Sequence, residues 1–214
     1  MNSIRKDMWN QYWYDRALNM NEKSFGKWIK KREIRIYGEK SLHKSYVRKI
    51  MNKTNDFMHY LNLDMMMVES KEESPIIRLF RDIPATNYKR REKVIPIDNE
   101  AVLRDFTYYT GGMFILTNIK IEDRKDYDGI AEFSSGIAIA SLGRLISDNH
   151  ELTEAVIKHE LAHMLGLKFH HLENEKCLMT EGINSYRLCR NCHNAINSFW
   201  NGIEERTNEK YLKV

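Results

Sequence analysis

The residues best suited to chemistry lie at 159–171, HELAHMLGLKFHH, a stretch that holds four of the chain's eight histidines. Residues four apart on an α-helix share a face, so His159 and His163 can present their imidazoles to one metal ion. Zinc lowers the pKa of its bound water to about 7, and a nearby carboxylate can then take a proton as that water attacks a carbonyl. The spacing therefore predicts a zinc half-site with Glu160 as general base.

A bare HExxH pattern also occurs in ordinary amphipathic helices, so a third ligand must decide between the two interpretations. Gly166 follows the second histidine by three residues, and glycine favours a helix end at which the chain turns back toward the metal. The best-known extension of the pattern has its third histidine where this chain has Phe169, whereas histidines follow at 170 and 171. The residues alone leave the third ligand open.

The three cysteines form a second candidate site. Cys177, Cys189 and Cys192 lie within one short window, and an odd, clustered set indicates metal binding rather than disulfides in a chain with no evident secretion signal. The CxxC pair has the spacing of zinc-binding thiolates. CxxC can also be a redox pair, but the βαβ context of that function is missing. With a histidine, the cysteines predict a Cys3His site.

In this order, HELAHMLGLKFHH, CLM at 177–179 and CRNC at 189–192 resemble the motifs of the archaemetzincins, a metzincin-clan family of zinc metallopeptidases. The resemblance covers roughly residues 113–192, and GIAEFSSGIAIASLGRL at 129–145 is similar to the edge-strand region of that family. It implies a catalytic zinc bound by three histidines, a second zinc bound by four cysteines, and a turn that carries Met179 beneath the first ion.

The fold class implied by the resemblance is α/β, in the α+β sense. We expect a compact metzincin-like zincin domain with a mixed sheet and an active-site helix. An antiparallel edge strand near residues 129–133 would lie along the cleft and bind an extended peptide by strand addition. A zinc-stapled segment would complete the C-terminal part of the domain.

The chain departs from the family pattern after Gly166. With one residue inserted there, His170 is the third catalytic ligand and His171 replaces the first cysteine of the second site. Without an insertion, Phe169 takes the ligand position, His170 serves the second zinc, and the catalytic ion keeps two protein ligands. We favour the insertion, because catalytic zinc normally has three protein ligands and loops absorb single insertions at little cost.

We therefore predict two zinc ions per chain, one catalytic and one structural. The catalytic ion is assigned to His159, His163 and His170, and the structural ion to His171, Cys177, Cys189 and Cys192. Glu173 and His193 are reserve ligands for the first and second sites, although a solvated charge and an ordinary surface histidine are the commoner roles of such residues.

Hydrophobic periodicity places these motifs in a mixed α/β fold. It predicts strands at 32–38, 64–70, 112–121 and 136–142, and helices at about 47–61, 148–166 and 187–203. All three prolines lie between about 70 and 98, which predicts a loop insertion there. The expected organisation is a basic, aromatic and helical N-terminal segment at 1–32 and a metallopeptidase domain at 33–214, with a structural zinc element at 171–192.

Composition limits the remaining possibilities. No apolar run approaches the roughly 20 residues of a membrane helix, and the N-terminus lacks a secretion signal, so we expect a cytoplasmic protein without a membrane span. The net charge of +4 arises in the first fifty residues, where thirteen Lys/Arg face five Asp/Glu. Interleaved aromatic and basic side chains there could bind nucleic acid. A helix that packs its aromatics on the domain is the commoner arrangement, so we expect no nucleic-acid partner.

The function that we expect is a zinc-dependent metallopeptidase. It would hydrolyse peptide bonds of a peptide or protein substrate as a monomer, with zinc-bound water activated by Glu160. The first alternative is a catalytically inactive metzincin-fold binding protein that retains only the structural zinc, as an occupied ligand position at Phe169 would imply. The second is a zinc-stabilised nucleic-acid binder that uses residues 1–32, for which binding should depend steeply on salt.

Overall fold

A computed structural model of the chain describes residues 32–74, 94–95, 112–121, 129–132, 136–142, 150–167, 170–171, 176–180 and 185–212. Nearly all of the predicted N-terminal segment and most of the predicted loop at 70–98 lie outside these residues. The proposed division of the chain into a segment and a domain stays a prediction. Among the described helices, none combines the length and apolar character that crossing a bilayer requires.

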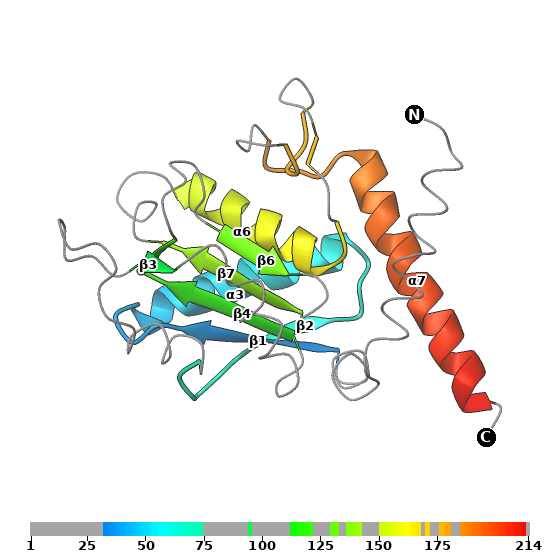
Figure 1. The fold of residues 1–214 in the computed structure, drawn as a ribbon, viewed down its shortest axis with the longest axis horizontal. Helices are drawn as coiled ribbons and strands as arrows, with labels where there is room; N and C mark the ends of the chain where they lie inside the picture. The colour runs from blue at the N-terminus through cyan, green and yellow to red at the C-terminus, as the bar shows by residue number, and fades with distance from the viewer. Residues whose placement is uncertain are drawn as a thin grey trace.

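Five strands form one mixed sheet in the order β2-β1-β4-β7-β6 (Figure 1). They are β1 (Glu33–Gly38), β2 (Met66–Glu69), β4 (Gly112–Thr117), β6 (Gly129–Glu132) and β7 (Ile137–Ser141). The pairs β1–β2, β1–β4 and β4–β7 are parallel, and β6 is antiparallel to β7. The predicted α/β fold class, with its antiparallel edge strand, is confirmed.

The two central strands are buried along their whole length. Every residue of β4 and of β7 is buried, as is typical of parallel strands with apolar side chains on both faces. The edge strand β2 instead alternates, with Met67 buried and Met66 and Val68 exposed. These burial patterns explain why the central strands read as continuous apolar runs in the sequence.

The predicted strand at 112–121 is wrong in one respect, because the chain changes sheets within it. β4 ends at Thr117, and β5 (Lys120–Ile121) pairs with β3 (Val94–Ile95) in a separate two-stranded sheet. At the break, the Thr117 hydroxyl donates to the Glu39 carboxylate at 2.8 Å, and the backbone N–H of Asn118 donates to the same oxygen at 2.7 Å. With these hydrogen bonds the chain leaves the β4 strand pairing. The pattern of hydrophobic residues gives no sign of them.

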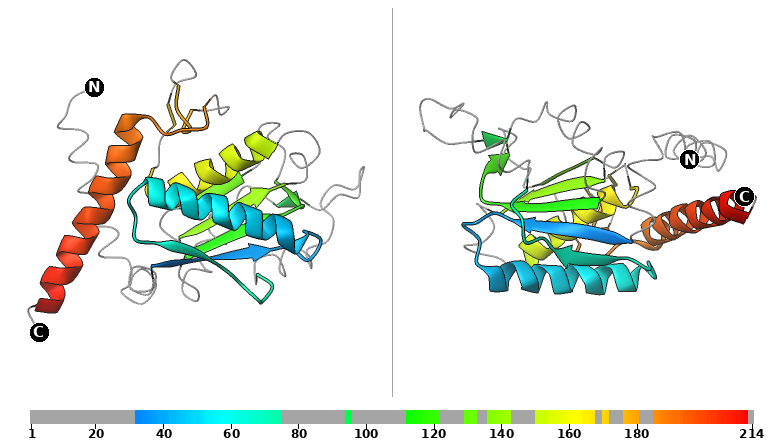
Figure 2. Two further views of the ribbon diagram at one scale, coloured as in Figure 1. Left: turned by 180° about the vertical axis from the view of Figure 1, so that it is seen from behind. Right: turned by 90° about the horizontal axis from the view of Figure 1, so that it is seen from below.

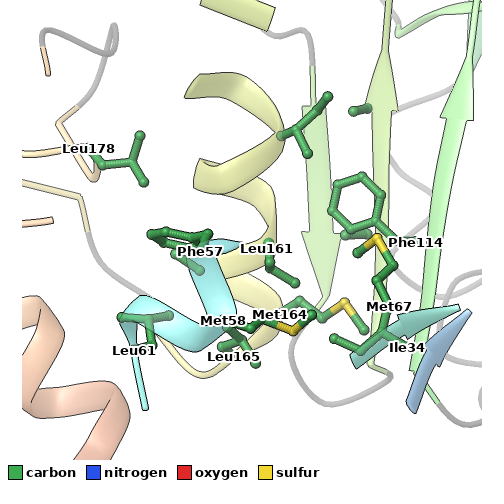
Figure 3. Close-up of a cluster of buried hydrophobic side chains, with 14 of the residues drawn as sticks. Ile34, Phe57, Met58, Leu61, Met67, Phe114, Leu161, Met164, Leu165 and Leu178 are labelled. Carbon is green, nitrogen blue, oxygen red and sulfur yellow. The ribbon is translucent and has the colours of Figure 1, made fainter. Parts of the chain in front are cut away.

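Helices α3 (Lys44–Tyr60) and α6 (His150–Met164) cover one face of the sheet (Figure 2). α3 packs on β1 and β2, and α6 packs on β6 and β7. Between them, Phe57, Leu161 and Met164 join residues of the sheet in one apolar core (Figure 3). Both helices were predicted to within a few residues, because their apolar positions recur at helical spacing.

The last helix, α7 (Arg190–Leu212), runs from the metal-binding region away from the sheet (Figure 1). Trp200 is buried, and its Nε1–H donates to the carbonyl of Leu165 at 3.1 Å, which fixes α7 against the end of α6. The predicted end at about 203 is too early. Apolar spacing reports only the packed part of a helix, whereas the backbone hydrogen bonds that extend it need no apolar side chain.

Candidate metal centres

The C-terminal end of α6 directs the chain back toward its own histidines. The N–H of Leu167 bonds the carbonyl of Ala162 at 3.0 Å, and the N–H of Gly166 bonds the carbonyl of His163 at 2.9 Å. This is a Schellman motif, and Gly166 takes the left-handed conformation that it requires, with φ of 113°. Glycine ends the helix here as predicted, and the chain returns to the helix at His170.

Three imidazoles converge at this end of α6. The Nε2 atoms of His159, His163 and His170 form a triangle in which every side is 3.0 Å. An ion at roughly 2.0–2.1 Å from each nitrogen fits this triangle and keeps a fourth position free, as in catalytic zinc sites. His159 is buried and His170 is exposed, so the cluster opens toward solvent on the side of His170.

Backbone carbonyls orient the two helix-borne histidines. Nδ1 of His159 lies 2.8 Å from the carbonyl oxygen of Leu178, and Nδ1 of His163 contacts the carbonyl oxygen of Leu167. A carbonyl only accepts, so each Nδ1 carries the proton and each Nε2 presents a lone pair to the other. Two lone pairs that face each other at 3.0 Å repel unless a cation lies between them. These nitrogen atoms are therefore suited to bind a zinc ion.

Burial keeps these histidines in the neutral form that metals require. Desolvation lowers the pKa of His159 to about 4, against a hydrogen bond to Leu178 that favours the charged form. Desolvation and the neighbouring His159 lower the pKa of His163 to about 3. Near neutral pH, a metal ion therefore has no proton to displace from either ring.

Glu160 follows His159 on α6 and is itself buried, with 7% of its surface exposed. Burial raises the pKa of its carboxyl group to about 8. A cation held by the three imidazoles would favour the carboxylate form. The group can therefore exchange a proton near neutral pH, which is what a general base needs.

The second cluster has four donors and is largely closed. Nε2 of His171 lies 3.0 Å from Sγ of Cys192 and 3.4 Å from Sγ of Cys189, and Sγ of Cys177 lies 3.8 Å from that of Cys192. All four ligand atoms lie within 4.8 Å of one another. Cys177 and Cys192 are buried, and the other two residues are half-buried. Four such donors fit the closed tetrahedral shell of structural zinc.

Backbone N–H groups point at the sulfur atoms of this cluster. Those of Met179 and Cys189 donate to Sγ of Cys177 at 3.4 and 3.2 Å. Desolvation raises the pKa of Cys177, and desolvation with the charges of the other thiols raises that of Cys192. Desolvation would also raise the pKa of Cys189, but hydrogen bonds, first that of the Cys192 backbone, lower it.

One turn connects the two clusters. Residues Cys177–Thr180 form it, with the N–H of Thr180 bonded to the carbonyl of Cys177 at 3.1 Å. This turn contributes a thiol to the second cluster and, one residue later, the Leu178 carbonyl that orients His159. The N–H of His171 also bonds the carbonyl of Met179 at 2.8 Å. The clusters therefore share both the 170–171 peptide and the turn.

The structure thus brings the seven predicted metal ligands together in two groups, in the arrangement expected for an insertion after Gly166. Phe169 and Glu173 lie outside the described residues. His193 is not in the cluster, because its Nε2 faces the carbonyl of Tyr60 at 3.3 Å. Met179 is fully buried within the connecting turn, and its place beneath the first ion stays a prediction.

Two features of the site were not predicted from the sequence. One is the Leu178 carbonyl, since backbone acceptors carry no sequence signal. The other is Gly129 on the edge strand, which packs directly against the side chain of Glu160. A glycine at the start of a predicted edge strand was the available hint, because glycine in a strand often marks a close approach.

Comparison with known proteins agrees with this architecture. No family model matches the sequence, and no curated protein matches it. Among solved structures, the chain is similar to the archaemetzincin of Methanopyrus kandleri, with 17% identity, a TM-score of 0.56, and coverage of 78% of this chain and 94% of that one. At this identity the similarity establishes the fold, and the predicted resemblance to archaemetzincins is confirmed at that level.

Two other solved structures are similar at lower TM-scores. The zinc-dependent peptidase of Methanocorpusculum labreanum has 15% identity and a TM-score of 0.47, with coverage of 77% of this chain and 100% of that one. The archaemetzincin of Archaeoglobus fulgidus has 19% identity and a TM-score of 0.48, with coverage of 76% and 99%. The chain thus spans nearly the whole length of each of these proteins.

Proposed function

We propose that this chain is a zinc-dependent peptidase with one catalytic and one structural zinc. The observation that carries the proposal is the convergence of three imidazole Nε2 atoms, each 3.0 Å from the other two, at the end of the helix that also carries the buried Glu160. Three protein donors with a free side are the ligand set of catalytic zinc, and four closed donors are that of structural zinc.

When bound by His159, His163 and His170, zinc supplies a Lewis acid that polarises a carbonyl and lowers the pKa of water. The chain supplies the rest of the reaction. Glu160 takes a proton from the attacking water and passes it to the departing amine. The edge strand β6 presents main-chain groups to an extended peptide, which holds the scissile bond near Glu160.

Metal analysis and peptide hydrolysis test the proposal together. The parent protein should contain about two zinc ions per chain, and H159A about one. E160Q should keep both ions and lose hydrolysis of a quenched peptide library by about 10²-fold or more. A matched control is E154Q, because Glu154 is also on α6 but pairs with Lys158. It should retain activity.

Two outcomes would contradict the proposal. Hydrolysis by E160Q at the rate of the parent would remove Glu160 from the reaction. One zinc per chain in both the parent and H159A, with no hydrolysis, would instead favour the inactive binding protein. In either case the fold would stand, because it is established independently of activity.

A further inference from the structure

The edge strand β6 packs against α6 (Figure 1), and it begins with a glycine, Gly129. Gly129 is buried and pairs with Ala140 of β7. A Cβ atom at this position would overlap Cγ, Cδ and Oε1 of Glu160. All three separations would be below 3.0 Å, which is closer than Cβ atoms in proteins approach other heavy atoms. The carboxyl group of Glu160 therefore occupies the space that any other residue at 129 would fill.

The neighbours of Gly129 on this face of the sheet are also small. Residues directly opposite each other in an antiparallel pair share a face, so Gly129 lies beside Ala140, and Ala131 beside Ala138. Ala138 and Ala140 are fully buried. Because small side chains allow close approach, α6 can lie near both strands.

Backbone conformation does not explain the glycine. Gly129 lies in the regular ladder with β7, and the described glycines with positive φ are Gly136 and Gly166. An alanine could adopt the backbone conformation of position 129. An alanine at this position would therefore require the side chain of Glu160 to move.

We propose that Gly129 is a positioning residue for Glu160. Its missing side chain forms a slot that holds the carboxyl group of Glu160 in one place beside the three imidazoles. The inference rests on the proposed function for the role of Glu160, whereas the slot is a property of the fold. The strand proposed to bind the substrate would then also hold the general base. One element would thus position both the base and the scissile bond.

The slot is tested first by thermal unfolding, which needs no activity. The zinc-loaded parent, G129A, E160A and the double variant are compared. G129A should lower Tm by roughly 3 °C or more when Glu160 is present. In the E160A background, the same substitution should leave Tm unchanged or raise it, because the new methyl group meets no carboxyl group and alanine restricts the unfolded chain.

A glycine elsewhere in the sheet gives a matched control. A Cβ at Gly38 would lie 2.7 Å from Cγ2 of Val47, far along the chain from Glu160. G38A should therefore lower Tm equally in both backgrounds. An equal fall for G129A in both backgrounds would overturn the slot. If G129A does not fold, folding of the double variant supports the slot, and failure of both variants overturns it.

Kinetics then test the consequence for the reaction. G129A should lower kcat by about tenfold or more, since a 1 Å displacement of a reacting group can cost about 10²-fold, while KM and zinc content stay near those of the parent. A change confined to KM, or an unchanged kcat, would overturn the positioning role. Absence of hydrolysis in the parent would contradict the proposed function instead, and the unfolding comparison would still decide on the slot.

Discussion

The two candidate metal-binding clusters of this protein share a turn but differ in number, type and exposure of their donors. The first offers three imidazoles and opens to solvent at His170, while the second offers three thiols and one imidazole that are mostly buried. Three donors leave a position for a substrate, whereas four close the shell. Under the proposed function, two neighbouring sites joined by one peptide bond would serve different purposes, the first for reaction and the second for structural support.

We expect structural support to run mainly from the second cluster to the first. The turn at 177–180 carries the Leu178 carbonyl that orients His159. The N–H of His171 bonds the carbonyl of Met179 in the same turn. Both elements are tied to the second cluster. By contrast, no ligand of the second cluster lies on α6, the helix that carries His159 and His163. Loss of the second metal should therefore disturb the first, and not the reverse.

The largest expected effect is that of C189S/C192S. Without these thiolates the turn is released, so zinc content should fall from about two per chain toward zero, with loss of hydrolysis. H159A, by comparison, should lose only one zinc. Metal analysis of the purified variants measures both. H193A is the control, because His193 adjoins Cys192 but lies outside the cluster. A double variant that retains the zinc that H159A loses would disprove the one-way dependence.

The pH dependence of zinc affinity should also separate the clusters. The pKa values of His159 and His163 are lowered to about 4 and about 3, so between pH 8 and pH 6 neither ring holds a proton that zinc must displace. The raised pKa values of Cys177 and Cys192 keep those thiols protonated in this range. As the pH falls from 8 to 6, the zinc affinity of the second cluster should therefore fall by up to about tenfold per pH unit for each thiol that must ionise.

Competition with a chelator, measured at several pH values, tests this difference. H159A reports the second cluster alone, and the parent reports the first while the second stays filled. Equal slopes for the two clusters would contradict the assignment of protonation states.

A smaller effect is expected for H171C, which gives the second cluster four thiolates. The N–H of residue 171 still bonds the Met179 carbonyl, so the first cluster should keep its zinc and its activity. The pH slope of the second cluster should increase by about one proton, since one more thiol must ionise. Chelator titration checks the slope. Loss of hydrolysis would show that the imidazole of His171 has a role beyond that of a ligand.

The smallest effect is expected for M179L. Met179 is fully buried in the connecting turn, and leucine has nearly the same volume. The free energy of unfolding should fall by less than about 1.5 kcal/mol, with zinc content unchanged. Denaturant unfolding and metal analysis test both. A zinc loss as large as that of the cysteine variants would indicate a direct role of the thioether at the metal.

Local spacing predicted much of the fold and of the site. The positions of His159, Glu160 and His163 on one helix follow from a period of 3.6 residues, and Gly166 marks the end of that helix. The CxxC pair lies across the start of α7, where Cys189 and Cys192 are one turn apart. Apolar patterning predicted β1, β2, β4 and β7, the resemblance predicted β6, and β3 was not predicted. Nor did the pattern indicate that hydrogen bonds to Glu39 end β4, where the chain changes sheets.

The sequence by itself determined which residues could bind metal, because ligand chemistry and helical spacing are local properties. Only the tertiary structure decided how they are grouped: His170 joins the helix-borne histidines and His171 joins the cysteines. That choice depends on the path of the chain after Gly166. The Leu178 carbonyl and the slot at Gly129 likewise arise where segments distant in sequence pack together, and no spacing along the chain encodes such contacts.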